Sequence, residues 1–301
     1  MFSIAKILEN YKLHLKSEST DRFKMFCVLA KSNPESARAE AVVFSMLNSN
    51  RLQVENHEDV SSGGPDFICR SNENNFLVEV SCLDTNSVAK ESNIPNDIST
   101  QAGASTYNAI TRLLRRKSSS KARQLSNQPL PRILAITTEH SAGDILLDGL
   151  AAERLLASDP KISVHLAQSN PITELTTDLK ESVFFRFSQD GKVESCRESI
   201  SALLLVSIAK NSCTVLGVLN PEPAIKFDIE LLPSIPFIRI SPWPIEENRI
   251  HTEWVVNSPE PKKFFILLRE IRQLPKNKSN LGSILGLCIT QVFCGTANNR
   301  A

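Results

Sequence analysis

The stretch GGPDFICRSNENNFLVEVSCLD, residues 63–84, has the pattern of a β-hairpin that carries two acids. The segments 66–70 and 76–83 are apolar enough to form strands, and the polar run SNENN lies between them. Because alternate residues of a strand share a face, Glu79 and Ser81 should point to the same side of the second strand. The stretch therefore predicts part of a β-sheet with a carboxylate among apolar neighbours.

The pairing of the two strands decides whether the two acids meet. One register pairs Arg70 with Asn75. It sets Asp66 directly opposite Glu79, where two facing carboxylates require a proton or a cation between them. The register shifted by one residue pairs Asp66 with Val80 and sends the acids to opposite faces. A simpler alternative is two unrelated surface acids, since an Asp after Gly-Pro is a common turn residue.

Helical patterns lie before and after the hairpin. In the first, which starts at the capping pair Asn33 and Pro34, Glu40 falls on the apolar stripe. The second spans about residues 102–125, and its apolar stripe ends in the polar residues Lys117, Lys121 and Gln124. Such a stripe points polar donors at the surface on which the helix packs, and the alternative is a solvated helix end. An apolar run at 132–138 then predicts a buried strand.

The second helix is also crowded with basic residues, among them Arg112, Arg115 and Arg116. Such a density is typical of a phosphate-binding strip, and a solvated basic face is equally common. The whole chain has 34 basic and 33 acidic side chains, so a nucleic-acid role would need a local patch of this kind.

The bulk composition indicates an α/β protein with strands and helices mixed along the chain. Its 301 residues suffice for a single elaborated domain, with a further helix predicted over 261–274. None of the seven cysteines forms a CxxC pair, which indicates reduced thiols and a cytoplasmic protein. The longest apolar run is too interrupted to span a bilayer, so we expect no membrane role.

The order of these features resembles that of the PD-(D/E)xK nuclease superfamily, whose fold is restriction-endonuclease-like. The features are a helix with Glu40, then GGPDF, then FLVEVSCL, a helix with Lys and Gln, and RILAI. The resemblance covers residues 33–138 and implies a nuclease-like core with a central mixed sheet flanked by helices. Residues 139–301 would then supply the remaining strands and helices of the same domain, or a C-terminal subdomain.

The resemblance also implies roles for individual residues. Asp66 and Glu79 match the acids that bind Mg²⁺ or Mn²⁺, and Glu40 matches a helical acid that assists them. Ser81 stands where the family has a lysine that helps to activate water. Lys117 or Lys121 is the replacement expected from the next helix, and the substrate-binding candidates are Arg112, Arg115, Arg116 and Gln124.

Two functions follow from this resemblance. The first is a metal-dependent nuclease that hydrolyses phosphodiester bonds, most readily those of DNA, and a homodimer is compatible with it. The second is a degenerate nuclease-like module that binds nucleic acid or a protein without cleavage, because Ser81 cannot supply a positive charge. A third option is an unrelated α/β protein in which the acids lie on the surface.

Overall fold

The structure is a computed structural model of the chain. It describes residues 3–57, 64–71, 74–96, 104–126, 128–157, 161–165, 172–176, 179–190, 192–210, 212–245, 250–255 and 262–264. The described residues belong to one compact unit, Met1–Leu268. The prediction of a single domain also includes residues 269–301, which lie outside the described part of the chain.

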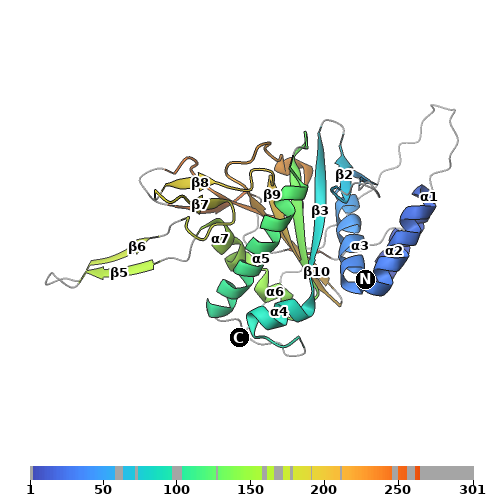
Figure 1. Cartoon of the computed structure of the whole chain (residues 1–301), viewed down its shortest axis with the longest axis horizontal. Coiled ribbons are helices and arrows are strands. Elements are labelled where there is room, and N and C mark those ends of the chain that lie inside the picture. Colours follow the sequence, from blue (N-terminus) through green and yellow to red (C-terminus); the bar gives the residue numbers. More distant parts are fainter. Residues whose placement is uncertain are drawn as a thin grey trace, which may run out of the picture. The chain divides into compact units, whose positions relative to one another are not determined.

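A mixed β-sheet forms the centre of this unit (Figure 1). Eight strands follow the order β1-β2-β3-β4-β9-β10-β11-β12, and β13 also pairs with β10. Their bounds are β1 Gln53–Asn56, β2 Phe67–Arg70, β3 Asn75–Leu83, β4 Arg132–Thr138, β9 Ala202–Ala209, β10 Ser212–Leu219, β11 Phe237–Ile240, β12 Thr252–Trp254 and β13 Lys262–Phe264. β1 to β3 are antiparallel, whereas β3, β4 and β9 run parallel. The predicted mixed α/β class with a central mixed sheet is thus confirmed.

Helices cover both faces of the sheet. On one face lie α1 Ile4–Glu18, α2 Thr20–Ser32 and α3 Pro34–Ser49, which pack side by side. On the other lie α4 Thr85–Ser92, α5 Ala104–Gln124, α6 Gly143–Leu146 and α7 Gly149–Leu156. Residues of β4 alternate between the two cores: Ile133 joins the first and Leu134 the second. α5 therefore lies against the face to which Glu79 and Ser81 should point.

Smaller elements complete the described part of the unit. β5 Lys161–His165 pairs with β6 Ile172–Thr176, and β7 Phe185–Phe187 pairs with β8 Val193–Ser195. One 3₁₀ turn, η1, covers Ile229–Leu231. Among the helices of the described residues, none is long and apolar enough to cross a membrane.

Of the two hairpin registers that the sequence leaves open, the structure has the one that pairs Arg70 with Asn75. Phe67 pairs with Val78 at the end of the hairpin. Asp66 is the residue before Phe67 and Glu79 the residue after Val78, so the two acids lie opposite each other one position beyond the last pair. The predicted helices and the strand at 132–138 are present as α3, α5 and β4. The helix predicted over 261–274 is wrong at Lys262–Phe264, which form β13 because this segment completes the free edge of β10. The rest of that segment lies outside the described residues.

Gly217 of β10 has no room for a side chain, because the ring of Phe237 occupies that space. It pairs with Phe237 of β11, and a Cβ at position 217 would lie 2.1 Å from the Phe237 ring. We expect Gly217→Ala to lower the free energy of unfolding by about 1–3 kcal/mol, since the ring must be displaced from a packed core. Urea unfolding followed by circular dichroism measures the change.

The control places the same alanine beside a smaller partner. In a Phe237→Leu background, Gly217→Ala should cost clearly less than it does in the natural chain, because the aromatic ring is gone. Equal costs in the two backgrounds would show that the ring is not the obstacle.

Candidate active site

Glu79 is a buried acid in the middle of the sheet. It lies on β3 between β2 and β4, and only 4% of its surface is exposed. Its Oε1 atom accepts a hydrogen bond from Lys121 Nζ of α5 at 2.6 Å. The lysine side chain is 24% exposed, so the cation lies between the buried acid and the solvent. An isolated carboxylate at this depth would be strongly unfavourable, and the ammonium group offsets that cost.

Lys121 reaches Glu79 because α5 is amphipathic. Ile110 and Leu114 are fully buried against the sheet, and Lys121 continues the same face two turns later. Lys121 also lies in the last turn of α5, where the negative end of the helix dipole favours a cation. Of the two lysines proposed as replacements for the motif lysine, Lys121 is the one that contacts Glu79.

Asp66 lies at the edge of β3, just before β2 begins. Its Oδ2 atom accepts a hydrogen bond from the backbone N–H of Val80 at 2.6 Å. Because backbone N–H groups of a strand lie in the plane of the sheet, this carboxylate takes the place that a strand carbonyl would occupy. Asp66 thus contacts the residue next to Glu79, at the point where β2 and β3 separate.

A second polar cluster surrounds Tyr11 of α1 on the opposite face of the sheet. The Tyr11 hydroxyl lies 2.6 Å from Glu40 Oε1 and 2.8 Å from Asn56 Oδ1, and the Asn56 amide donates to Glu18. Burial, followed by the charge of Glu40 and its hydrogen bond, raises the pKa of Tyr11 well above its ordinary value, with a smaller contribution from the charge of Asp66. Glu40 is therefore oriented by Tyr11, a contact that its own sequence neighbourhood does not reveal.

Two further predicted site residues, Lys117 and Ser81, make no side-chain hydrogen bond to Glu79 in the described part of the chain. Lys117 lies near Cys82 and Asp84 and acts on both electrostatically. Ser81 is buried on the Glu79 face, and its Oγ atom has no hydrogen-bond partner among the residues described. Gln124 is the last residue of α5, and its side chain lies outside the described part.

The three predicted substrate-binding arginines separate into two kinds. Arg115 turns inward: it donates to the carbonyl of Arg154 in α7 and lies 3.8 Å from Glu181. Arg112 and Arg116 are exposed, and Arg116 pairs with Glu91 of α4. Only the exposed pair is placed to meet a large ligand.

The predicted metal-binding acids do not form a cluster of three in the described part of the chain. Among the described residues, no three His, Cys, Asp or Glu side chains are arranged to hold a metal. Glu40 contacts Tyr11, whereas Asp66 directly precedes β2 and lies next to the pair formed by Phe67 and Val78, opposite Glu79 of β3. Mg²⁺ bound to a phosphate needs only one or two protein carboxylates, and Asp66 and Glu79 are the two acids that could supply them here.

Comparisons of the chain with protein-family models, with curated proteins and with solved structures found no match.

Lys121 should be essential for stability because it neutralises a buried charge. We expect Lys121→Met to lower the free energy of unfolding by about 3 kcal/mol, since the methionine keeps the volume but leaves Glu79 unneutralised. Adding Glu79→Gln to Lys121→Met should restore much of this loss. Urea unfolding of the four chains of this double-mutant cycle measures it.

Lys117→Met is the matched control, one helical turn away on α5 and not bonded to Glu79. It should change the stability by no more than about 0.5 kcal/mol. A Lys121→Met chain as stable as the Lys117→Met chain would contradict the role of the ion pair.

Tyr11 should make the stability depend on pH in the alkaline range. Because its pKa is raised on folding, it stabilises the fold fully below about pH 10, where free tyrosine is still protonated. That contribution is lost as the pH rises towards the pKa of the folded state. The urea midpoint of the natural chain should thus fall more steeply above pH 10 than that of Tyr11→Phe. Parallel slopes in the two chains would rule out the effect.

Proposed function

We propose that this chain is a metal-dependent nuclease that hydrolyses phosphodiester bonds of DNA at Asp66, Glu79 and Lys121. One observation carries the proposal: the ammonium group of Lys121 lies 2.6 Å from Glu79, beside the strand position of Asp66. Two acids at adjoining positions of a sheet, with a cation from the helix that covers it, are the groups that metal-assisted phosphodiester hydrolysis uses.

The arrangement of residues 33–138 supports the proposal. α3, the strands β1 to β3, α5 and β4 follow one another along the chain, and the four strands are neighbours in that order. This is the order of features on which the resemblance to the PD-(D/E)xK superfamily rests. A restriction-endonuclease-like core over 33–138 is accordingly part of the proposal.

The chemistry assigns a separate task to each side chain. A bound Mg²⁺ or Mn²⁺ would lower the pKa of a coordinated water and neutralise charge on the phosphate. Asp66 and Glu79 would hold the ion, and the bond from Val80 N–H fixes the orientation of the Asp66 carboxylate. Lys121 bonds to Glu79 and would place a positive charge beside the scissile phosphate. Glu40 bonds to Tyr11 on the opposite face of the sheet, so we assign it no direct contact with the ion, and Ser81 offers only a hydroxyl on the same face as Glu79.

A second candidate function is DNA binding without cleavage. Two observations favour it: Glu79 is only 4% exposed, and Lys121 bonds directly to the acid that would hold the metal. In that case the ion pair would serve stability alone, and the surface of α5 would provide the binding.

Cleavage of supercoiled plasmid DNA with Mg²⁺ or Mn²⁺ tests the proposed function. The natural chain should nick the plasmid, and Asp66→Asn should abolish nicking. The asparagine oxygen can still accept from Val80 N–H, so this variant removes the charge and keeps the contact. The double variant Lys121→Met with Glu79→Gln leaves no uncompensated buried charge, and it should also be inactive.

Lys117→Met again serves as the control and should retain cleavage, since Lys117 does not contact Glu79. A natural chain that shows no metal-dependent cleavage would overturn the nuclease. If that chain binds DNA in a salt-sensitive way, and Asp66→Asn binds equally well, the second candidate function replaces it.

A further inference from the structure

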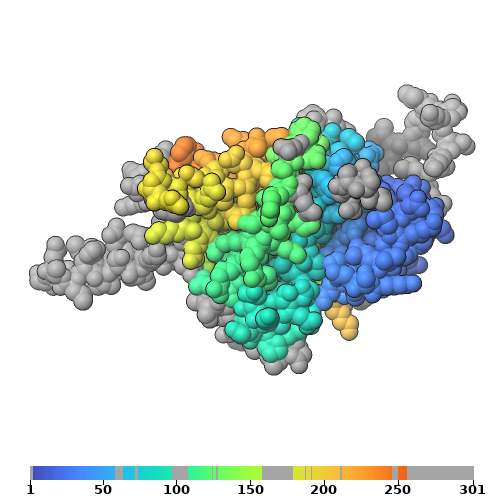
Figure 2. Space-filling view, in the orientation of Figure 1, coloured from blue at the N-terminus to red at the C-terminus, as the bar shows by residue number. Residues whose placement is uncertain are grey.

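The outer face of α5 carries a row of arginines. Arg112, Arg116, Ser119 and Arg123 recur at spacings of four, three and four residues, which places them on one side of the helix. All four are exposed, while Arg115 of the same helix turns inward. Figure 2 shows α5 in green along the surface of this view. We call Arg112, Arg116 and Arg123 the α5 ridge.

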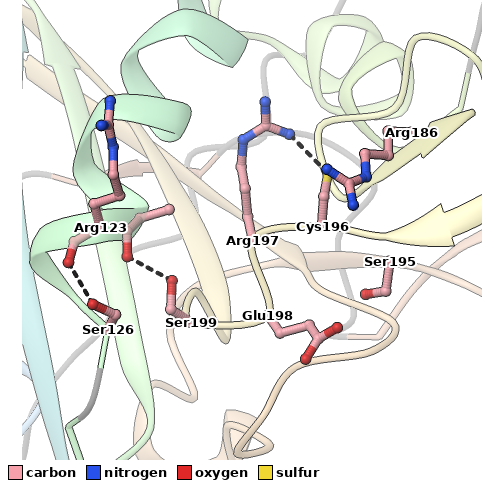
Figure 3. Close-up of a pocket in the computed structure, with 9 residues that line it drawn as sticks. Arg123, Ser126, Arg186, Ser195, Cys196, Arg197, Glu198 and Ser199 are labelled. Carbon is pink, nitrogen blue, oxygen red and sulfur yellow. Dashed lines mark hydrogen bonds between the residues drawn. The ribbon is translucent and has the colours of Figure 1, made fainter. Parts of the chain in front are cut away.

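The ridge ends at an open hollow of about 400 Å³ (Figure 3). Its lining comes from the end of α5 and from the segment around β7 and β8, and it includes Arg123, Arg186 and Arg197. Arg197 is held in place because its guanidinium donates to Ser119 of α5 and to the carbonyl of Val183. Two segments far apart in the sequence thus bring their arginines to one surface.

The charge of this surface is only partly compensated. Neither Arg123 nor Arg197 pairs with a carboxylate within the described ranges. Arg116 pairs with Glu91 and Arg186 with Glu194, but these pairs are solvent-exposed and therefore weak, so a phosphate can compete for the arginines. Glu198 is the acid that lines the hollow, and in Figure 3 its side chain points away from the Arg197 guanidinium.

We propose that the α5 ridge, together with Arg186 and Arg197, binds the sugar-phosphate backbone of double-stranded DNA. This inference rests on the proposed function, because the ridge lies on the same helix as Lys121 and would bind the substrate of the proposed nuclease. From Arg112 to Arg123 the ridge is about 16 Å long, at 1.5 Å per helical residue. That length matches about five base pairs of one strand, at 3.4 Å per phosphate along the duplex axis.

The chemistry of the hollow favours a duplex over a single strand. Proteins that bind single strands without sequence preference stack the bases on aromatic side chains. None of the residues that line the hollow is aromatic; they are arginine, serine, alanine, cysteine and glutamate. A row of guanidinium groups without a stacking surface contacts phosphates alone, so the binding should not depend on base sequence.

Fluorescence anisotropy with a labelled 20-bp duplex in EDTA tests this surface apart from catalysis. Arg112→Gln and Arg123→Gln should each weaken binding and reduce the slope of log K against log salt by about one. Glu198→Gln should tighten binding, a gain that partial misfolding cannot produce. Arg239→Gln is the matched control, since this exposed arginine of β11 pairs with Glu253 away from the hollow and should bind as the natural chain does.

The outcomes separate this surface from the nuclease itself. If the natural chain binds the duplex but the Arg112, Arg123 and Glu198 variants bind with unchanged affinity and slope, the ridge is overturned whether or not the chain cleaves DNA. Failure of the natural chain to bind, or tighter binding of the single strand than of the duplex, overturns it as well. If the variants behave as expected and no metal-dependent cleavage occurs, the ridge stands and the nuclease falls.

Discussion

The burial of the Glu79 carboxylate is the constraint on which the candidate site depends. β3 lies inside the sheet, so a charge on its α5 face has no route to bulk water through the strand itself. The neutralising cation must come from whatever covers that face. β3 and β4 are parallel neighbours, and a parallel pair requires a crossover connection, which here contains α4 and α5. The same connection that the topology demands therefore delivers Lys121.

The helix serves two surfaces because its faces carry different residues. Its inner face is apolar up to the last turns, where Lys121 meets Glu79. Its outer face presents the arginines of the α5 ridge, and Arg197 ties that face to the segment near β8 through Ser119. A shift of α5 along β3 would displace both surfaces together, so the docking of one helix determines the geometry of both.

Local patterns explain which features could be predicted from the sequence. The polar turn and the alternation of residues predict the hairpin and narrow its register to two alternatives, and the helical spacing predicts that Lys117 and Lys121 lie on the inner face of α5. The choice between these two lysines depends on where the helix docks, since one turn moves a side chain by about 5.4 Å. The inward turn of Arg115 towards α7 is a tertiary contact of the same kind. The Tyr11 to Glu40 contact joins residues of separate helices, and no spacing rule predicts it.

Ser81 acquires a different meaning once Lys121 is placed. Residues 79 and 81 share a face of β3, and that face is covered by α5. A lysine at position 81 would bring a second ammonium group to the buried surface that Lys121 already enters, where like charges in a region of low dielectric repel strongly. A small neutral residue avoids this repulsion, and Ser81 is 3% exposed with its hydroxyl turned into the protein. Because α5 supplies the cation, position 81 can hold a small neutral residue. Ser81 is therefore explained by the position of Lys121.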